Sequence, residues 1–202
     1  MRLLMIASSL HFDSFLVSAM ICQTSGHFDF RGYLDVPTTP GDSLSYQERV
    51  GHMLIADGVP DCLKRTREVL RMGGSQIKTA GGGGVGSTYD PADVQEFTYE
   101  EVKAVVDAAA CWGTYVTAHV FADNGIKNCL KAGVKCIEHG MLASDETLDL
   151  MKEHGVWLSL QCLFDDELKM ESNFRLGRLR HRSTFRLRMA PSRLESVPER
   201  ME

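Results

Sequence analysis

Hydrophobic and polar positions follow two kinds of pattern through the middle of the chain. Short apolar runs typical of buried strands are separated by longer segments in which apolar residues recur every three or four positions, as on one face of a helix. The runs predicted to be strands are residues 15–23, 75–78, 115–119, 136–139 and 156–161. Strands separated by helices at this pitch predict an α/β fold with parallel strands and right-handed crossovers.

The predicted helices begin at recognisable capping residues. Thr98 and Glu101 have the spacing of a capping box, and Ser144 precedes another helical stretch. Two further helices are predicted over residues 60–72 and 123–131. The proline- and glycine-containing stretch 32–57 is predicted to be a long loop.

A glycine-rich run follows the second strand-like segment. Gly81, Gly83 and Gly86 have the spacing of a dinucleotide-binding fingerprint. Residues 87–91 are typical of a turn, however, and no helix is predicted before Thr98 to receive a pyrophosphate. We therefore expect a flexible loop over the mouth of an active site.

Charge is divided unevenly along the 202 residues. The net charge is −5, but residues 174–202 contain eight Arg, no Lys and three Glu, a local balance of +5 that leaves −10 for the rest. An acidic body argues against nucleic acid as the main partner. Both helical and strand periodicity disappear after residue 162, so residues 163–202 are predicted to be a disordered or irregular Arg-rich tail.

Cysteine usage and hydropathy favour a cytoplasmic protein. The six cysteines are widely spaced and include no CxxC pair, which fits neither a zinc finger nor a small disulfide scaffold. No run of 18 apolar residues exists, so we expect no membrane span.

Three polar residues end predicted strands. Lys78, His119 and His139 each come at the end of an apolar run and lead into loop. In a barrel of alternating strands and helices, the carboxyl ends of the strands converge on one face. Two imidazoles meeting there suit zinc, so a metal site is predicted.

Each candidate also has a structural interpretation. His119 and His139 are equally well explained as hydrogen-bonded residues at a barrel rim, and Lys78 as an ion-pair partner, although desolvation would make its amine nucleophilic. His27 follows the first strand and either hydrogen-bonds a substrate or stabilises its own turn. Glu138 is interpreted as structural.

Four ordered segments resemble the amidohydrolase superfamily. They are Ser25-Gly-His-Phe-Asp29, Gln76-Ile-Lys-Thr-Ala-Gly-Gly-Gly83, Thr117-Ala-His-Val120 and Ala132-Gly-Val-Lys-Cys-Ile-Glu-His-Gly140. The branch they resemble contains imidazolonepropionase-like enzymes and metal-dependent Xaa-Pro or Xaa-Arg dipeptidases. The resemblance implies a TIM-type (β/α)₈ barrel with one or two divalent metals, zinc being expected.

The resemblance also implies residue roles. Lys78 would be a catalytic, carboxylated lysine that bridges two metals, with His119 and His139 binding the more exposed ion. His27 would contact the substrate. These metals would acidify a water and polarise an amide carbonyl, so that the water attacks at neutral pH.

Two expected parts of the family pattern do not appear in the sequence. There is no His-x-His pair, and nothing after Gln161 looks like the family's last, aspartate-bearing strand. About five of eight strands are recognisable. We therefore predict a truncated member, with a partial barrel over residues 1–162 and the irregular tail over 163–202.

The leading functional hypothesis is a metal-dependent hydrolase of amide or peptide C–N bonds in dipeptide-like molecules. One rival is a non-catalytic remnant that binds metal weakly. Another is a nucleic-acid-binding module that uses the Arg-rich tail. The leading hypothesis expects a small-molecule partner, no nucleic acid and no membrane, and leaves a homo-oligomer open.

Overall fold

Six parallel strands form one sheet in a computed structural model of the chain, which describes residues 18–32, 34–35, 43–86 and 89–160. The strands are β1 (Met20–Cys22), β2 (Met53–Ile55), β3 (Ile77–Ala80), β4 (Val116–Ala122), β5 (Cys136–Leu142) and β6 (Trp157–Ser159). Their order across the sheet is β2-β1-β3-β4-β5-β6, and every neighbouring pair is parallel. Strands β1, β3, β4, β5 and β6 follow one another across the sheet in chain order, as in part of a (β/α)₈ barrel, whereas β2 lies on the outer side of β1.

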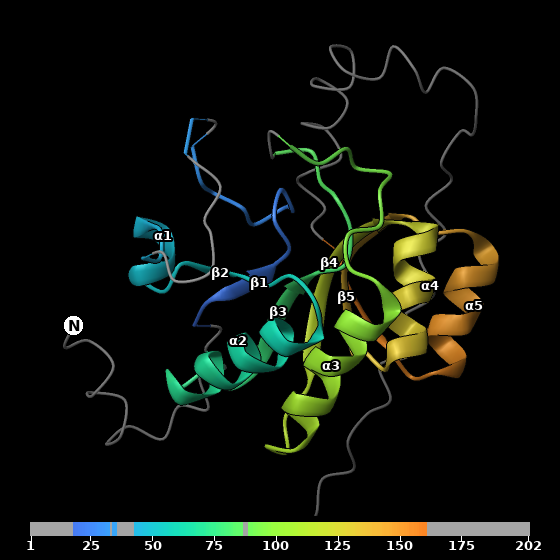
Figure 1. Cartoon of the computed structure of the whole chain (residues 1–202). Coiled ribbons are helices and arrows are strands. Elements are labelled where there is room, and N and C mark those ends of the chain that lie inside the picture. Colours follow the sequence, from blue (N-terminus) through green and yellow to red (C-terminus); the bar gives the residue numbers. More distant parts are fainter. Residues whose placement is uncertain (1–17, 33, 36–42, 87–88, 161–202) are drawn as a thin grey trace, which may run out of the picture. The chain divides into compact units, whose positions relative to one another are not determined.

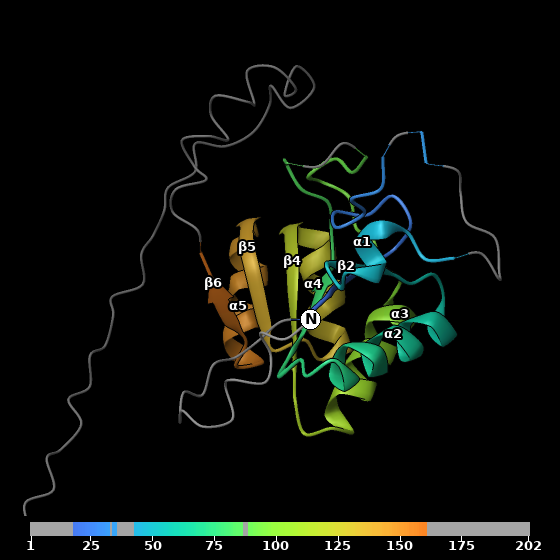
Figure 2. The same ribbon diagram turned by 90° about the vertical axis from the view of Figure 1, so that its left-hand side faces the viewer.

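Four longer helices lie along one side of this sheet (Figure 1). They are α2 (Val59–Arg71), α3 (Tyr99–Ala110), α4 (Asp123–Ala132) and α5 (Asp145–Glu153), whereas α1 (Tyr46–Arg49) is a single turn near β2. Apolar residues of strands and helices pack between the two layers as the main core. In the perpendicular view, the loops that follow β1 and β3 gather beyond the carboxyl ends of the strands (Figure 2).

The predicted helix ends are confirmed by their capping contacts. Thr98 and Glu101 form the capping box of α3, and the Ser144 side chain accepts a hydrogen bond from the Thr147 backbone N–H at the start of α5. Helix α4 ends at Gly133, whose φ of 99° lies in the left-handed region that glycine adopts without strain. None of the helices in the described part of the chain is long and apolar enough to cross a bilayer.

The predicted loop over residues 32–57 is wrong in its second half. It contains α1 and β2, and β2 pairs with β1 along its whole length. Three residues are too few to show a period, which is why the apolar pattern did not reveal β2. The described sheet therefore has six strands where the pattern indicated five; residues 15–17 of the first predicted strand, Gln161 and the tail 163–202 lie outside the described residues.

Candidate active site at the carboxyl ends of the strands

Strand alternation separates the candidate site residues from the helix-side core. Ala118 and Val120 of β4 belong to that core, so His119 between them points to the opposite face of the sheet. Ile77 of β3 likewise packs toward the helices, and Lys78 points the other way. We call the helix-free side of the sheet the site face.

His139 reaches the site face through an irregularity in β5. It has a φ of 73°, and the β4–β5 register shifts beside it, between Val120 and Ala122. A bulge of this kind re-aims a side chain, and non-glycine residues in the left-handed region concentrate at functional sites. The His139 ring meets the His119 ring edge-on, with ring centroids 4.6 Å apart, and stacks on Phe121.

Lys78 is paired with a carboxylate that the sequence analysis interpreted as structural. Its Nζ forms an ion pair with Glu138, and the Glu138 Oε1 accepts a 2.7 Å hydrogen bond from the Thr117 hydroxyl. Lys78 is 8% exposed. Lys78 is therefore an ion-pair partner within the site, as one of its two interpretations predicted.

Burial sets the protonation of the three predicted site residues. It lowers the pKa of His119 to about 2, helped by the neighbouring His27, His139 and Lys78, and it lowers the pKa of His139 to about 4, helped by Lys78 and His27. Both imidazoles are therefore neutral at pH 7, the form that ligates metals. Burial also lowers the pKa of Lys78 to about 8, and Cys136 opposes this in part. The ion pair with Glu138 favours the ammonium as well, because the partner is an anion.

His27 lies in the loop after β1 and stacks directly on His119. The two ring centroids are 3.7 Å apart and the planes differ by 6°. The His27 backbone N–H donates to Glu96 Oε1 over 2.8 Å, and its Nδ1 lies 3.0 Å from Asp90 Oδ2. The structure thus brings all four predicted site residues together.

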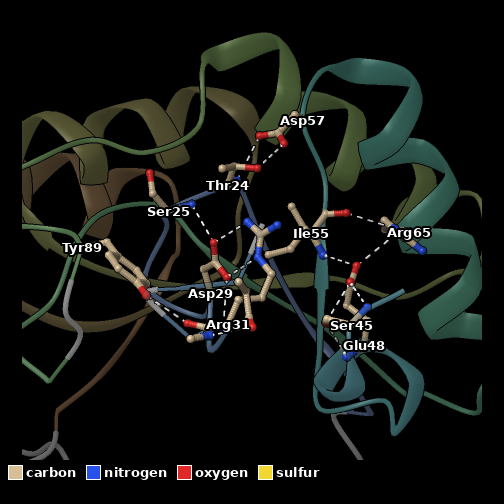
Figure 3. A network of polar contacts seen from close by, with 12 residues as sticks. Thr24, Ser25, Asp29, Arg31, Ser45, Glu48, Ile55, Asp57, Arg65 and Tyr89 are labelled. Atoms are coloured by element: carbon tan, nitrogen blue, oxygen red, sulfur yellow. Dashed lines mark hydrogen bonds and ion pairs between the residues drawn. The ribbon is translucent and has the colours of Figure 1, made fainter. Parts of the chain in front are cut away.

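A polar network holds the remainder of this loop (Figure 3). Asp29 accepts the Ser25 backbone N–H and forms a two-pronged ion pair with Arg31, at 2.6 and 2.7 Å. Thr24 donates both its N–H and its hydroxyl to Asp57 after β2, and the Tyr89 hydroxyl donates to the Arg31 carbonyl. The loop is therefore tied at both ends, which restricts where His27 lies between them.

The glycine-rich run packs against the two stacked rings. Gly81 to Gly84 are all buried. The Gly83 carbonyl accepts a 3.2 Å hydrogen bond from His119 Nε2, and a Cβ on Gly84 would lie 2.0 Å from the His27 ring and 2.9 Å from that of His119. Absence of side chains allows this close approach. The four glycines form a packed wall of the site, where we had expected a flexible cover.

Sequence reasoning missed two buried carboxylates. Asp90 lies within the predicted loop over residues 80–95 and Glu96 directly follows it, and their contacts with His27 span 63 and 69 residues. Burial, reinforced by the negative charge of Asp90, raises the pKa of Glu96 to about 8. A carboxylate or carboxylic acid in a polar turn has no local signal of burial, because the burying segment lies elsewhere in the chain.

The metal-binding potential of the site depends on Lys78. His119 and His139 provide two neutral imidazoles side by side. In the described part of the chain, no three His, Cys, Asp or Glu side chains are grouped so that they could hold a metal ion. The histidine pair thus fits a cation only if a further donor joins it, and the unmodified Lys78 is not that donor because its ammonium group is paired with Glu138.

Known proteins are similar to this chain over most of its length. The sequence profile of the amidohydrolase family matches residues 15–190. Ochratoxinase from Aspergillus niger is 32% identical over 180 residues, which cover 75% of this chain and 37% of that protein.

Two solved structures are also similar. A prolidase complexed with N-methylphosphonate-L-proline has 31% identity and a TM-score of 0.67, over 79% of this chain and 38% of that one. An Xaa-Pro dipeptidase with bound methionine has 27% identity and a TM-score of 0.61, over 78% and 37% of the two chains. The chain spans little more than a third of the length of these relatives.

Proposed function

The chain belongs to the amidohydrolase family, and on that premise we propose that its site serves metal-dependent hydrolysis of amide or peptide C–N bonds in small molecules. The observation that carries the proposal is the cluster of Lys78, His119 and His139 on the site face. The rings of His119 and His139 meet edge-on with centroids 4.6 Å apart, and burial, with a contribution from the charge of Lys78, lowers the pKa of both. Perturbed titratable groups gathered at strand ends are typical of catalytic sites.

The proposed ligands are the two imidazoles and a modified lysine. His119 donates Nε2–H to the Gly83 carbonyl, so Nδ1 is the nitrogen that would face a cation. A neutral Lys78 amine can add carbon dioxide to give a carbamate and release a proton. The carbamate shares one negative charge between two oxygens, which suits a metal cation as a lysine ammonium does not. The buried setting of Lys78 supports this reaction because it favours the neutral amine. A divalent ion, with zinc expected, would supply a Lewis acid that polarises an amide carbonyl and acidifies water.

A dipeptide-like substrate is supported by the relatives and by His27. Two similar structures are a prolidase and an Xaa-Pro dipeptidase. His27 covers one face of His119, and its side chain is 17% exposed. A molecule bound next to His119 would therefore meet the His27 ring, which we propose hydrogen-bonds the substrate.

Metal content tests the proposed ligands. The purified chain is stripped of metal, incubated with zinc and bicarbonate, desalted and subjected to elemental analysis. We expect bound zinc in the wild type and its loss in Lys78→Ala and His119→Ala. Lys64→Ala and His154→Ala, which alter exposed residues of the same types, serve as matched controls. Equal zinc content in all five proteins would refute the assignment.

A second candidate is metal binding without turnover. It is favoured by the sequence, which contains no His-x-His pair and so lacks two ligands that the family pattern includes. Incubation of the zinc-loaded chain with a set of dipeptides and N-acyl amino acids distinguishes the two. Turnover that disappears in His119→Ala would refute the non-catalytic candidate.

A further inference from the structure

Asp90 joins the glycine-rich wall to the His27 ring. Its side chain is 2% exposed, and one oxygen, Oδ2, accepts the Gly84 backbone N–H at 2.7 Å and lies 3.0 Å from His27 Nδ1. A carboxylate only accepts hydrogen bonds, so this contact requires the proton of His27 on Nδ1. The other oxygen, Oδ1, is buried without a hydrogen-bond partner among the described residues.

The His27 ring transmits this constraint to His119. The rings lie parallel with centroids 3.7 Å apart, whereas Phe28 and Phe121 meet His119 edge-on. The Gly83 carbonyl holds the proton of His119 on Nε2. The wall segment and the Asp90 carboxylate therefore each fix one protonated nitrogen of the stacked pair, Nε2 of His119 and Nδ1 of His27.

Glu96 also binds the loop that carries His27, but through a different group. It accepts the backbone N–H of His27 through Oε1, over 2.8 Å, which is a contact with the main chain of His27. Glu96 thus constrains the main chain, whereas Asp90 constrains the imidazole. Removing Asp90 should therefore change the orientation and tautomer of the His27 ring, whereas removing the Glu96 charge should not.

We propose that Asp90 is a positioning residue that holds His27 as the Nδ1–H tautomer, flat against His119, and so fixes the direction in which His119 presents Nδ1. Its effect on metal affinity rests on the proposed function above, but its effect on the two rings does not. The same contact also sets the orientation of His27 toward a substrate next to it.

Nitrogen-15 NMR of histidine-labelled protein tests the positioning directly. In metal-free wild type we expect a protonated Nδ1 on His27 and a slowly exchanging Nε2–H on His119. In Asp90→Ala, His27 becomes a mixture of tautomers and the His119 Nε2–H signal broadens. Asp90→Asn retains both signals because its amide oxygen still accepts, and Glu96→Gln retains the His27 tautomer. Asp93→Ala, an exposed aspartate of the same loop, leaves both unchanged.

Zinc affinity provides the second readout. Partners that orient metal ligands contribute about 10–100-fold to affinity, so Asp90→Ala should bind zinc weaker by about that factor and Asp90→Asn should recover most of it. Wild-type His27 and His119 signals in Asp90→Ala would overturn the proposal.

Failure of the proposed metal centre, or failure of Asp90→Ala to fold, can be told apart from failure of the Asp90 proposal. A wild type that binds no zinc refutes the proposed metal centre, and the NMR experiment still decides the role of Asp90. If Asp90→Ala does not fold by circular dichroism, Asp90→Ser replaces it, since serine stays polar but is too short to reach Nδ1; unchanged ring signals in that variant contradict the proposal equally.

Discussion

The two faces of the sheet are built from neighbouring residues of the same strands, but one face is governed by apolar packing and the other by interactions between titratable groups. Toward the helices, Ala118 and Val120 are buried among apolar side chains, and their contribution is hydrophobic and insensitive to pH. On the site face, His119 is just as buried but surrounded by titratable groups. Burial alone therefore does not distinguish packing from chemistry; the neighbours across the face do.

The largest expected effect is on the helix side. Ile77→Ala removes a fully buried side chain from the main core, so we expect the free energy of unfolding to fall by about 2–5 kcal/mol. Urea denaturation followed by circular dichroism measures it. Leu148→Ala, at a half-exposed position of α5, should change stability by no more than about 0.5 kcal/mol. Equal losses would mean that this face is not the main source of stability.

Glu96 should make the stability of the site side depend on pH. Its pKa is raised from 4.5 to about 8 by burial, so the folded state keeps the proton where the unfolded state loses it. The stability contributed by this group is complete below about pH 4.5 and is lost as pH rises through about 8, with a slope of at most about 1.4 kcal/mol per pH unit.

Glu96→Gln removes that titration while keeping an acceptor for the His27 N–H. Its stability relative to wild type should therefore increase from pH 5 to pH 8, as measured by urea denaturation at several pH values. Parallel pH curves for the two proteins would show that the Glu96 carboxyl is not desolvated.

Gly84→Ala tests the close approach of the wall to the two rings. The added Cβ would overlap the His27 ring, so we expect a loss of about 1–3 kcal/mol from overpacking. We also expect lower zinc content because the stacked rings separate. Gly86→Ala is the matched control, since its Cβ would meet nothing within 4 Å. If both variants lose the same stability, the cost comes from the loop backbone and not from the rings.

The smallest expected effect concerns the cap of α3 on the helix side. The Thr98 side chain accepts the Glu101 N–H, and Thr98→Ala should cost about 1 kcal/mol without altering the site face. Thermal denaturation measures the loss of stability, and zinc content shows whether the site face is unchanged. A fall in zinc content with so small a stability loss would show that the two faces are coupled.

Much of the helix side was predictable because the residues that start and end a helix lie within a few positions of one another in the sequence. The capping box at Thr98, the cap at Ser144 and the helix end at Gly133 were all predicted from the sequence and are confirmed. Strand β2 was missed because three residues carry no measurable period. Its short neighbour α1, with a capping box at Ser45, was the available signal.

The site was predictable only in part. Lys78, His119 and His139 were identifiable as polar residues in the carboxyl-terminal parts of apolar runs, which parallel strands bring to one edge. The prediction that they end their strands is wrong, because β3 continues to Ala80, β4 to Ala122 and β5 to Leu142. Asp90 and Glu96 were not, because their role arises from contacts with a loop more than sixty residues away. The Lys78–Glu138 pair likewise depends on the register between β3, β4 and β5.

The sequence by itself determined the alternation of parallel strands and helices and the residue types at the strand ends, because periodicity and capping act over a few neighbouring positions. Tertiary structure decided which groups are neutral, which nitrogen of His119 carries the proton, and which carboxylate holds His27. Those properties depend on desolvation and on distances between segments far apart in the chain, and both arise only when the sheet and its loops have come together.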